Sequence, residues 1–337
     1  MTLTERIESL VYLGTVLEHP SEIMKAVMQR AEIENAWFTQ ESIQKAIRGV
    51  GMWLKPDELH SWINKYKIAD RMPERTGMIL AGNIPMVGFH DVMTNYLAGN
   101  VSVIRFSEKD NVLIPYMLRI ISEAFPGAEM YFDYKEDFKT IDRLVATGSD
   151  SAAGLFRNYF SHVPALIRCH RNAVAVITGD ETDEELLALG EDAFSYFGLG
   201  CRNVSKLYVP SGYVFDRLLE LWHDRYKEMV LHSKYKNNFD YLYAVYLLNK
   251  EPFLANGHVI IRESEGLSSP VASLFFEYYD KISDVAAKLA ALKDKLQVVI
   301  SKIPLHEFNS VIPGEAQYPA IDDYADGVDT MEFLLNN

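Results

Sequence analysis

The sequence places one cysteine in a setting that suits nucleophilic chemistry. Cys201 follows the glycine-rich run 198–200 and precedes a β-type segment at 205–209, which ends at Pro210. Glycines let the backbone take positive φ angles and approach a ligand closely, and a thiolate held at such a corner could attack a carbonyl carbon. A lone cysteine more often packs as a small apolar residue. On this segment alone, both interpretations stay open.

Three other segments place small or polar residues directly after short apolar runs. They are AGNIPMVG at 81–88, IRFSEKDN at 104–111 and ATGSDSAAG at 146–154. Each begins where a strand is expected to end and a helix to start, and the N-terminus of a helix offers backbone N–H groups to an anion. No G-x-G-x-x-G follows a predicted strand, and no G-x-x-x-x-G-K-S/T occurs. The three segments together still predict an anion-binding edge.

The elements that would position these segments alternate between strands and helices. Residues 1–72 predict helices, one of them behind a Thr39 cap and another starting at Pro56. Strands are expected at 78–81, 101–105, 130–132, 144–147 and 173–177. A second series predicts helices at 183–197, 215–229, 238–248 and 281–296, and strands at 206–209, 258–261, 271–276 and 297–300. This alternation predicts parallel sheets whose ligands bind at the carboxyl ends of the strands.

The composition excludes several functional classes. With 337 residues, 48% of them hydrophobic, the chain predicts two domains or one large α/β unit. Its 33 basic and 47 acidic residues give a net charge of −14, which argues against nucleic acid as a partner. Cys169 and Cys201 cannot form a disulfide framework, and no Cys/His cluster has the spacing of a metal site. Without a signal-type segment or a long apolar run, we expect a cytoplasmic protein with no membrane span.

In combination, the segments resemble motifs of the aldehyde dehydrogenase superfamily. In chain order, GNIP with Asn83, RFSE at 105–108, TGS at 147–149 and GLGC with Cys201 are similar to its Pro-Trp-Asn-Phe-Pro type, Lys-Pro-Ser-Glu, Thr-Gly-Ser and catalytic-cysteine motifs. The resemblance implies that Cys201 is the nucleophile. It also implies that the Asn83 amide and the Cys201 N–H stabilise the oxyanion. Outside the resemblance, Asn83 is equally well explained as a turn former.

The chain is more specifically similar to the LuxC family of fatty acyl-CoA reductases. The similarity rests on AWFTQESI at 36–43 with HSWINKY at 60–66, on GCRNVSKLYVP at 200–210, and on GEAQYPAIDDYADGVDTMEFLL at 314–335. It implies an α/β, aldehyde dehydrogenase-like fold of two doubly wound α/β domains with an N-terminal helical segment. The expected division is 1–172 for the helical segment and the dinucleotide-binding domain, 173–305 for the catalytic domain, and 306–337 for a tail that packs back on the domains.

The same resemblance implies that an acyl-CoA is reduced to an aldehyde, with NADPH as hydride donor and NADH as the alternative. The residues that it assigns to the cofactor are Arg105, Ser107, Glu108, Thr147, Gly148 and Ser149. A guanidinium at Arg105 suits a 2′-phosphate, whereas Glu108 suits the ribose hydroxyls of NAD. Phe106 replaces the family's proline, and TGSDSAAG has one more residue between its glycines than many relatives. Both departures leave the detailed cofactor geometry open.

A missing carboxylate helps to select among the reactions of the superfamily. Aldehyde-oxidising members carry a glutamate that activates water, but the matching segment here, IRCHRNAVAV at 167–176, has no acidic residue. An acyl-enzyme would therefore persist for reduction. His170 could transfer a proton or could be structural, and Cys169 is expected to be buried. Two alternatives stay open: an aldehyde dehydrogenase that hydrolyses its acyl-enzyme or uses acyl phosphate, and an inactive binding subunit of the same fold.

Two further expectations concern the thiolate and the partners. Cys201 follows the C-terminal end of the predicted helix at 183–197, where the helix dipole disfavours an anion, so that helix cannot account for a thiolate. Arg202 or the positive ring of a bound cofactor could favour it instead. The resemblance implies a homo-oligomer that works beside an acyl-activating or acyl-transferring protein.

Overall fold

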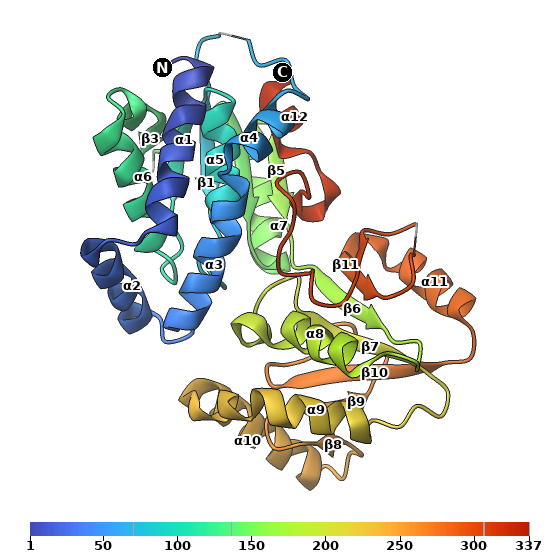
Figure 1. Cartoon of the computed structure of the whole chain (residues 1–337). Coiled ribbons are helices and arrows are strands. Elements are labelled where there is room, and N and C mark those ends of the chain that lie inside the picture. The colour runs from blue at the N-terminus through green and yellow to red at the C-terminus, as the bar shows by residue number, and fades with distance from the viewer. Residues whose placement is uncertain (70, 136, 306, 337) are drawn as a thin grey trace. The chain divides into compact units, whose positions relative to one another are not determined.

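The computed structural model describes residues 1–69, 71–135, 137–305 and 307–336 (Figure 1). It divides into two compact units. Unit 1 is Met1–His170 together with the C-terminal segment that starts at Ala320, and unit 2 is Arg171–Pro319. Among the helices in these described ranges, none combines the length and the apolar character needed to cross a bilayer.

The N-terminal region of unit 1 is helical, as predicted. Its helices are α1 (Leu3–Glu18), α2 (Glu22–Glu34), α3 (Gln40–Trp53) and α4 (Pro56–Ile63). The Thr39 hydroxyl accepts a hydrogen bond from the Ser42 N–H and caps α3, whose buried face includes Ile43 and Ile47. Pro56 lies in the first turn of α4, where its missing N–H costs nothing. Both helix starts read from the sequence are confirmed.

The sheet of unit 1 has the order β3-β2-β1-β4-β5, and its neighbouring strands are parallel. The strands are β1 (Arg75–Ile79), β2 (Val101–Arg105), β3 (Phe132–Asp133), β4 (Arg143–Thr147) and β5 (Ala165–Arg168). The connecting helices are α5 (Phe89–Leu97), α6 (Leu113–Ala124) and α7 (Asp150–Tyr159). The chain first builds outward from β1 through β2 and β3, and then adds β4 and β5 on the other side. Because parallel crossovers are right-handed, this reversal puts α7 on the opposite face from α5 and α6.

Two expectations for this sheet were wrong or incomplete. The segment 130–132, predicted as a strand, lies mostly in the 3₁₀ helix η1 (Ala128–Tyr131), and only Phe132–Asp133 pairs with β2. Gly127, with a φ of 95°, begins this turn. The apolar residues after it suggested a strand, although they lack the period-two alternation that distinguishes one. Strand β5 was not predicted because it is an edge strand whose first residue, Ala165, is exposed.

The sheet of unit 2 has the order β12-β11-β6-β7-β10-β9-β8, in which β8 and β9 pair antiparallel and the other pairs are parallel. The strands are β6 (Asn172–Val176), β7 (Val204–Pro210), β8 (Leu254–Ala255), β9 (Ile260–Glu263), β10 (Ser273–Tyr279), β11 (Leu296–Ser301) and β12 (Ser310–Val311). The helices are α8 (Asp183–Phe194), α9 (Asp216–Tyr226), α10 (Ser233–Leu248) and α11 (Ile282–Ala291).

Alternate residues of each central strand in unit 2 face opposite helical layers. Ala173 and Ala175 of β6 pack in the cluster that contains α8 and α9, whereas Val174 and Val176 pack in the cluster that contains α11. Both faces of the sheet are therefore covered, and the predicted α/β class is confirmed. The predicted helices at 183–197 and 281–296 are shorter than expected, since they end at Phe194 and Ala291.

The C-terminal segment of unit 1 ends in α12 (Thr330–Leu335) and is held by buried arginines. The guanidinium of Arg168 donates to Asp91 Oδ2 at 2.6 Å and to Thr330 Oγ1 at 2.7 Å. At the other end of α12, Arg143 donates to the carbonyl oxygen of Phe333, so a cation lies at the negative end of the helix dipole.

We expect Arg168→Met to lower the free energy of unfolding by about 3 to 5 kcal/mol, because it leaves the buried Asp91 carboxylate without its counter-charge. Arg217→Met is the matched control, since the Arg217–Asp183 pair is exposed and is expected to contribute at most about 1 kcal/mol. Urea denaturation followed by circular dichroism measures both. Equal losses for the two variants would contradict the interpretation of Arg168 as a buried ion-pair partner.

His258 lies fully buried in unit 2 against the ring of Phe194, and neither ring nitrogen has a hydrogen-bond partner among the described residues. Burial, followed by the nearby His223, lowers the pKa of His258 to about 4, from 6.5 in the unfolded chain. The folded protein binds a proton at His258 less readily than the unfolded chain does. The stabilisation that this difference in pKa contributes is therefore complete above pH 6.5 and is lost as the pH falls from 6.5 towards 4.

The loss attributable to His258 should reach roughly 3 kcal/mol by pH 4. The variant His258→Phe should lose that part of the pH dependence between pH 6.5 and 4. Urea denaturation at a series of pH values, compared between wild type and variant, checks this. Parallel curves for the two proteins would show that His258 does not contribute.

Candidate active site

The three anion-binding segments predicted from the sequence lie at the carboxyl end of the unit 1 sheet. They follow β1, β2 and β4, which are neighbours and parallel, so their carboxyl ends face the same way (Figure 1). The chain reverses its direction of winding between β1 and β4. In doubly wound sheets the ligand binds at this reversal point, because the loops on either side of it diverge there. The topology thus gathers the predicted cofactor residues where a dinucleotide would bind.

The loops after β1 and β2 pack closely against each other. A Cβ atom at Gly82 would lie 2.5 Å from Ser107 Oγ, so this approach requires a glycine. The adjacent Asn83 and Ser107 are both half-buried. The Ser107 hydroxyl accepts a hydrogen bond from the Lys109 N–H at 3.3 Å, which folds the second loop back on itself. The positions of Asn83 and Ser107 therefore depend on each other.

Charged and aromatic side chains follow β2. Arg105 and Glu108 are exposed, as ligand-binding side chains at a sheet edge need to be. Phe106, which stands where the motif that the sequence resembles has a proline, stacks on Tyr134 beyond β3, with ring centroids 5.9 Å apart and planes at 29°. The loop after β2 is thus braced by an aromatic pair in place of a proline ring.

The turn after β4 leads into α7. The Gly148 N–H donates to the carbonyl oxygen of Arg168 at 3.1 Å, and the exposed Ser149 caps α7 by accepting from the Ala152 N–H. Thr147, the last residue of β4, is half-buried. Asp150 adds a negative charge in the first turn of α7, which weakens that helix end as an anion site.

These observations fit a dinucleotide as a class of ligand. The strand order is that of a mononucleotide-binding fold, and exposed side chains of both charges border the carboxyl ends of the strands. Arg105 and Ser149 supply donors for phosphate oxygens, and Glu108 supplies an acceptor for hydroxyl groups. Within the described residues no group of three or more His, Cys, Asp or Glu side chains could hold a metal ion.

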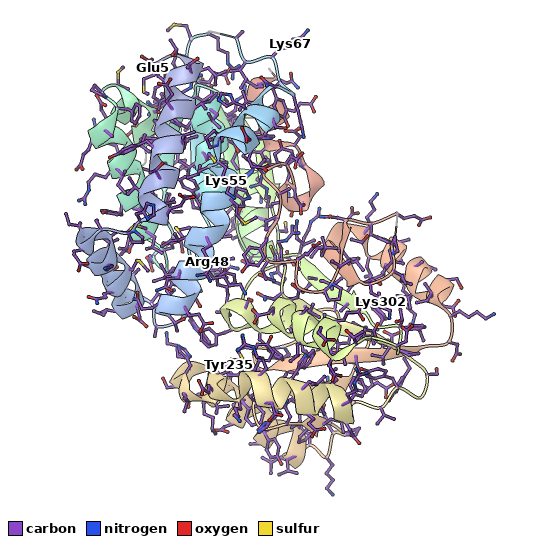
Figure 2. All side chains as sticks on the ribbon, in the orientation of Figure 1. Glu5, Arg48, Lys55, Lys67, Tyr235 and Lys302 are labelled. Atoms are coloured by element: carbon purple, nitrogen blue, oxygen red, sulfur yellow. The ribbon has the colours of Figure 1, made fainter. Side chains whose placement is uncertain are left out.

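Cys201 lies in unit 2, on a turn between α8 and β7. After α8 ends at Phe194, Tyr196, Phe197 and Gly198 take left-handed backbone angles, with φ of 53°, 58° and 75°. The first two carry side chains, for which this conformation is strained. The ring of Phe197 packs on His232 and on Tyr235 near the start of α10, and these contacts hold the strained backbone in place. Tyr235 is labelled in Figure 2.

The side chain of Asn203 organises the turn that carries Cys201. Asn203 donates its N–H to the Gly200 carbonyl at 3.0 Å, which makes Cys201 and Arg202 the central residues of a β-turn. Its side-chain oxygen accepts from the Gly200 N–H at 2.7 Å. Its amide nitrogen donates to the carbonyl oxygens of Asp192 and Ser195, at 3.0 and 2.9 Å. Asn203 is 3% exposed, so these bonds are shielded from water.

A second anchor comes from the segment at 314–317. The Asp192 carboxylate on α8 has no exposed surface and accepts from the N–H groups of Gly314 and Ala316, at 2.6 and 3.0 Å. The Ala316 carbonyl accepts from Arg202 Nε at 2.5 Å, and the Gln317 amide donates to the Arg202 carbonyl at 3.0 Å. Hydrogen bonds therefore hold Arg202, the residue next to Cys201, through both its side chain and its backbone.

The structure distributes the predicted site residues over the two units. Asn83, Ser107 and Thr147, with their loops, share one edge of the unit 1 sheet, and Cys201 belongs to unit 2. Cys169, expected to be buried, is half-buried instead, because it follows the edge strand β5, and Arg157 donates to its sulfur at 3.4 Å. His170 is exposed.

The sequence reasoning missed Asn203, Asp192 and Gln317. Only Asn203 left a local signal, as a turn-forming residue two positions after the cysteine. The other two act over more than a hundred residues of sequence. Sequence spacing alone could not identify them.

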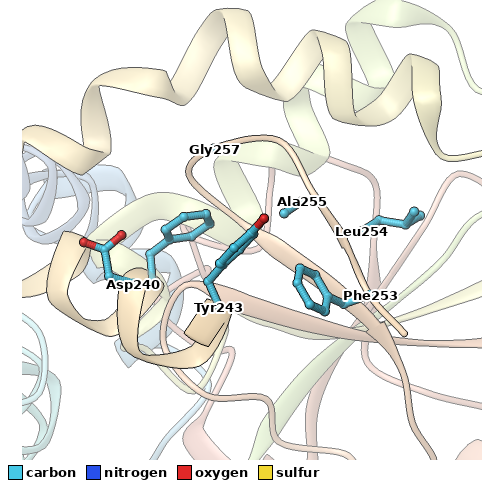
Figure 3. A pocket seen from close by; sticks show the side chains of 7 residues that line it. Asp240, Tyr243, Phe253, Leu254, Ala255 and Gly257 are labelled. Carbon is cyan, nitrogen blue, oxygen red and sulfur yellow. The ribbon is translucent and has the colours of Figure 1, made fainter. Parts of the chain in front are cut away.

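A separate groove of about 660 Å³ lies in unit 2, and none of the residues predicted for the site lines it (Figure 3). Its walls come from α10 and from the segment around β8, and they are largely aromatic and apolar. The lining residues are Phe239, Asp240, Tyr243, Phe253, Leu254, Ala255 and Gly257.

No family model matches the chain, and no curated protein matches it. Solved aldehyde dehydrogenase structures do share its fold. Aldehyde dehydrogenase 21 from Physcomitrella patens, in complex with the reaction product succinate, has a TM-score of 0.70 at 13% identity, over 99% of this chain and 85% of that chain. The aldehyde dehydrogenase KauB from Pseudomonas aeruginosa has a TM-score of 0.64 at 12% identity, over 89% of this chain and 72% of that chain.

A Bacillus cereus aldehyde dehydrogenase in complex with NAD+ has a TM-score of 0.63 at 13% identity, over 91% of this chain and 73% of that chain. Similarity at this level of identity shows the fold. The predicted aldehyde dehydrogenase-like fold is therefore confirmed.

We expect Asn203→Ala to lower the free energy of unfolding by about 2 to 4 kcal/mol, because it leaves the buried polar groups of the Cys201 turn without partners. The loosened turn should also expose the Cys201 thiol, so its alkylation by iodoacetamide should become several-fold faster. Urea denaturation and peptide mass spectrometry measure the two effects, with Cys169 as the internal reference. The exposed Asn249→Ala is the control, and equal Cys201 alkylation rates in Asn203→Ala and wild type would exclude this role for Asn203.

Proposed function

We propose that the protein is an NADPH-dependent acyl-CoA reductase that converts an acyl-CoA to an aldehyde through a cysteine-bound acyl group. The observation that carries the proposal is the placement of the half-buried Cys201 on a doubly anchored turn in front of β7. The ordered motifs at 82–85, 105–108 and 147–149 support it, because they follow neighbouring strands of a doubly wound sheet. The aldehyde dehydrogenase-like fold supports an oxidoreductase that acts at the aldehyde level.

In this proposal the Cys201 thiolate attacks the thioester carbonyl carbon. A new carbon–sulfur bond forms, the bond to the coenzyme A sulfur breaks, and coenzyme A leaves as a thiolate that takes up a proton. The side-chain amide of Asn83 and the Cys201 N–H donate to the carbonyl oxygen while it carries negative charge. The fixed β-turn keeps the Cys201 sulfur in one orientation, so little reorganisation is needed at the moment of attack.

The nicotinamide of NADPH, when bound, supplies the hydride that reduces the acyl-enzyme. Arg105 would hold the 2′-phosphate as a bidentate donor, Glu108 the ribose hydroxyls, and Ser107 with the 147–149 turn the remaining polar groups. The reduced adduct on Cys201 then collapses, which breaks its carbon–sulfur bond, releases the aldehyde and regenerates the thiolate. NADH is the alternative donor because Glu108 also suits a ribose without a 2′-phosphate.

The segment between β5 and β6 supports reduction over hydrolysis. Aldehyde oxidation in the superfamily needs a carboxylate that activates water, whereas residues 167–176 contain none. An acyl-enzyme without this base is attacked slowly by water and persists until hydride arrives. The proposal includes the cytoplasmic location that we expect from the sequence. It also includes self-association and cooperation with an acyl-activating or acyl-transferring protein, which the resemblance implies.

Mass spectrometry after incubation with acyl-CoAs of several chain lengths tests the proposal. We expect a single acyl adduct on Cys201 that is absent in Cys201→Ser, is unchanged in Cys169→Ser, and disappears with release of aldehyde when NADPH is added. The Cys201→Ser variant should lose at least about a thousandfold in rate, as is typical when a covalent nucleophile is removed.

Release of carboxylate in place of aldehyde would instead identify a hydrolytic aldehyde dehydrogenase. Tight NADPH binding without any adduct, across the whole series of acyl-CoAs, would identify an inactive binding subunit. Either result would overturn the proposed reduction.

A further inference from the structure

A buried carboxylate joins the two loops that carry Asn83 and Ser107. Asp110 lies in the loop between β2 and α6 and is 3% exposed. Its Oδ2 accepts a hydrogen bond from the Met86 N–H at 2.6 Å, across 24 residues of sequence. Its own N–H donates to the Ser107 carbonyl at 3.0 Å. Asp110 therefore belongs to one loop and fixes the backbone of the other.

Met86, the residue that Asp110 holds, is the bend between the Asn83 turn and α5. It is 3% exposed and has a φ of 58°, a left-handed conformation that is strained for a residue with a side chain. Its carbonyl accepts from the Phe89 N–H at 2.9 Å, at the first turn of α5. Both backbone groups of Met86 are thus engaged, and the bond to Asp110 is what maintains the strained angle on its N–H side.

The remainder of the Asp110 loop is fixed as well. A Cβ atom at Gly82 would lie 3.2 Å from the Asp110 nitrogen, so the two loops touch through their backbones. The Asn35 amide, at the end of α2, donates to the Lys109 carbonyl at 3.1 Å. Because the loop after β2 is anchored from both sides, its carboxylate can act as a rigid support for the loop after β1.

The carboxylate of Asp110 is costly where it lies. Burial raises its pKa to about 6, although the N–H groups of Met86 and Leu113 favour the ionised form. Its second oxygen, Oδ1, has no hydrogen-bond partner within the described residues. A buried oxygen without a partner lowers stability, and such costs are concentrated at sites where position matters more than stability.

We propose that Asp110 is a positioning residue of the active site: its carboxylate sets the strained bend at Met86 and thereby holds Asn83 in place. The inference rests on the proposed function for the role of Asn83. The structural step, from Asp110 to the Asn83 loop, does not depend on it. The two parts therefore need separate measurements.

Hydrogen exchange of the Met86 amide tests the structural step. In Asp110→Ala the peptide that covers 81–88 should exchange faster than in wild type, and Asp110→Asn, which keeps an acceptor oxygen, should restore most of the protection. If Asp110→Ala does not fold, Asp110→Leu takes its place. The control is Asp142→Ala, because Asp142 accepts the Arg75 N–H at 2.7 Å at the other end of β1. Unchanged exchange at 81–88 in both Asp110→Ala and Asp110→Leu would overturn the inference.

A double-mutant cycle with Asn83→Ala tests the functional step. We expect Asp110→Ala to lower kcat for acyl-CoA reduction on the order of ten- to a hundredfold, as misplacement of a catalytic group does, with a small change in the KM for NADPH. In the Asn83→Ala background the same substitution should cost about twofold or less, since the loop then carries no donor to misplace.

The possible outcomes separate the two proposals. If Asn83→Ala itself leaves kcat unchanged, the proposed oxyanion role fails, while the exchange result still decides the structural step. If Asn83→Ala lowers kcat and Asp110→Ala lowers it further by the same factor in both backgrounds, Asp110 does not act through Asn83 and the positioning role is excluded.

Discussion

Buried carboxylates that accept backbone N–H groups hold the two candidate loops of this protein in shape. Asp192 in unit 2 binds the N–H groups of Gly314 and Ala316, and Asp110 in unit 1 binds that of Met86. Removing a carboxylate from water costs several kcal/mol unless donors compensate it. Compensation by backbone N–H groups restricts where those donors can lie, so each carboxylate fixes the path of a distant segment.

This arrangement explains how strained backbone persists beside the chemistry. Left-handed angles at Met86, Tyr196 and Phe197 each cost about 1 to 2 kcal/mol and would relax in an isolated loop. They are sustained because Asp110 grips Met86, and because Asn203 and the ring of Phe197 lock the turn before Cys201. A loop held in this way returns to one geometry after each encounter with a ligand. That is the property required of an oxyanion donor or a nucleophile.

Local patterns in the sequence predicted the scaffold well and the supports poorly. The Thr39 cap, the start of α4 at Pro56 and the bounds of β2 follow from neighbouring residues, and each was predicted. The η1 turn and the end of α8 at Phe194 were not, because positive φ at Gly127 and strained angles at Tyr196 interrupt apolar patterns that appear continuous. Asp110 and Asp192 gave no local signal, since an Asp in a loop is ordinarily a solvated turn residue and an Asp on a helix is ordinarily a solvated surface residue.

The fold constrains the chemistry less than individual residues do. Aldehyde dehydrogenases that share 12 to 13% identity with this chain have the same architecture, so the architecture cannot choose between oxidation and reduction. A cysteine-bound acyl group is common to both directions, and its fate depends on whether water or hydride reaches the carbonyl first. A carboxylate between β5 and β6 would favour water. Residues 167–176 offer only thiol, imidazole, guanidinium and amide groups beside their apolar ones. In the proposed function, hydrolysis therefore lacks its base while the Cys201 turn stays intact, and this is why we propose reduction.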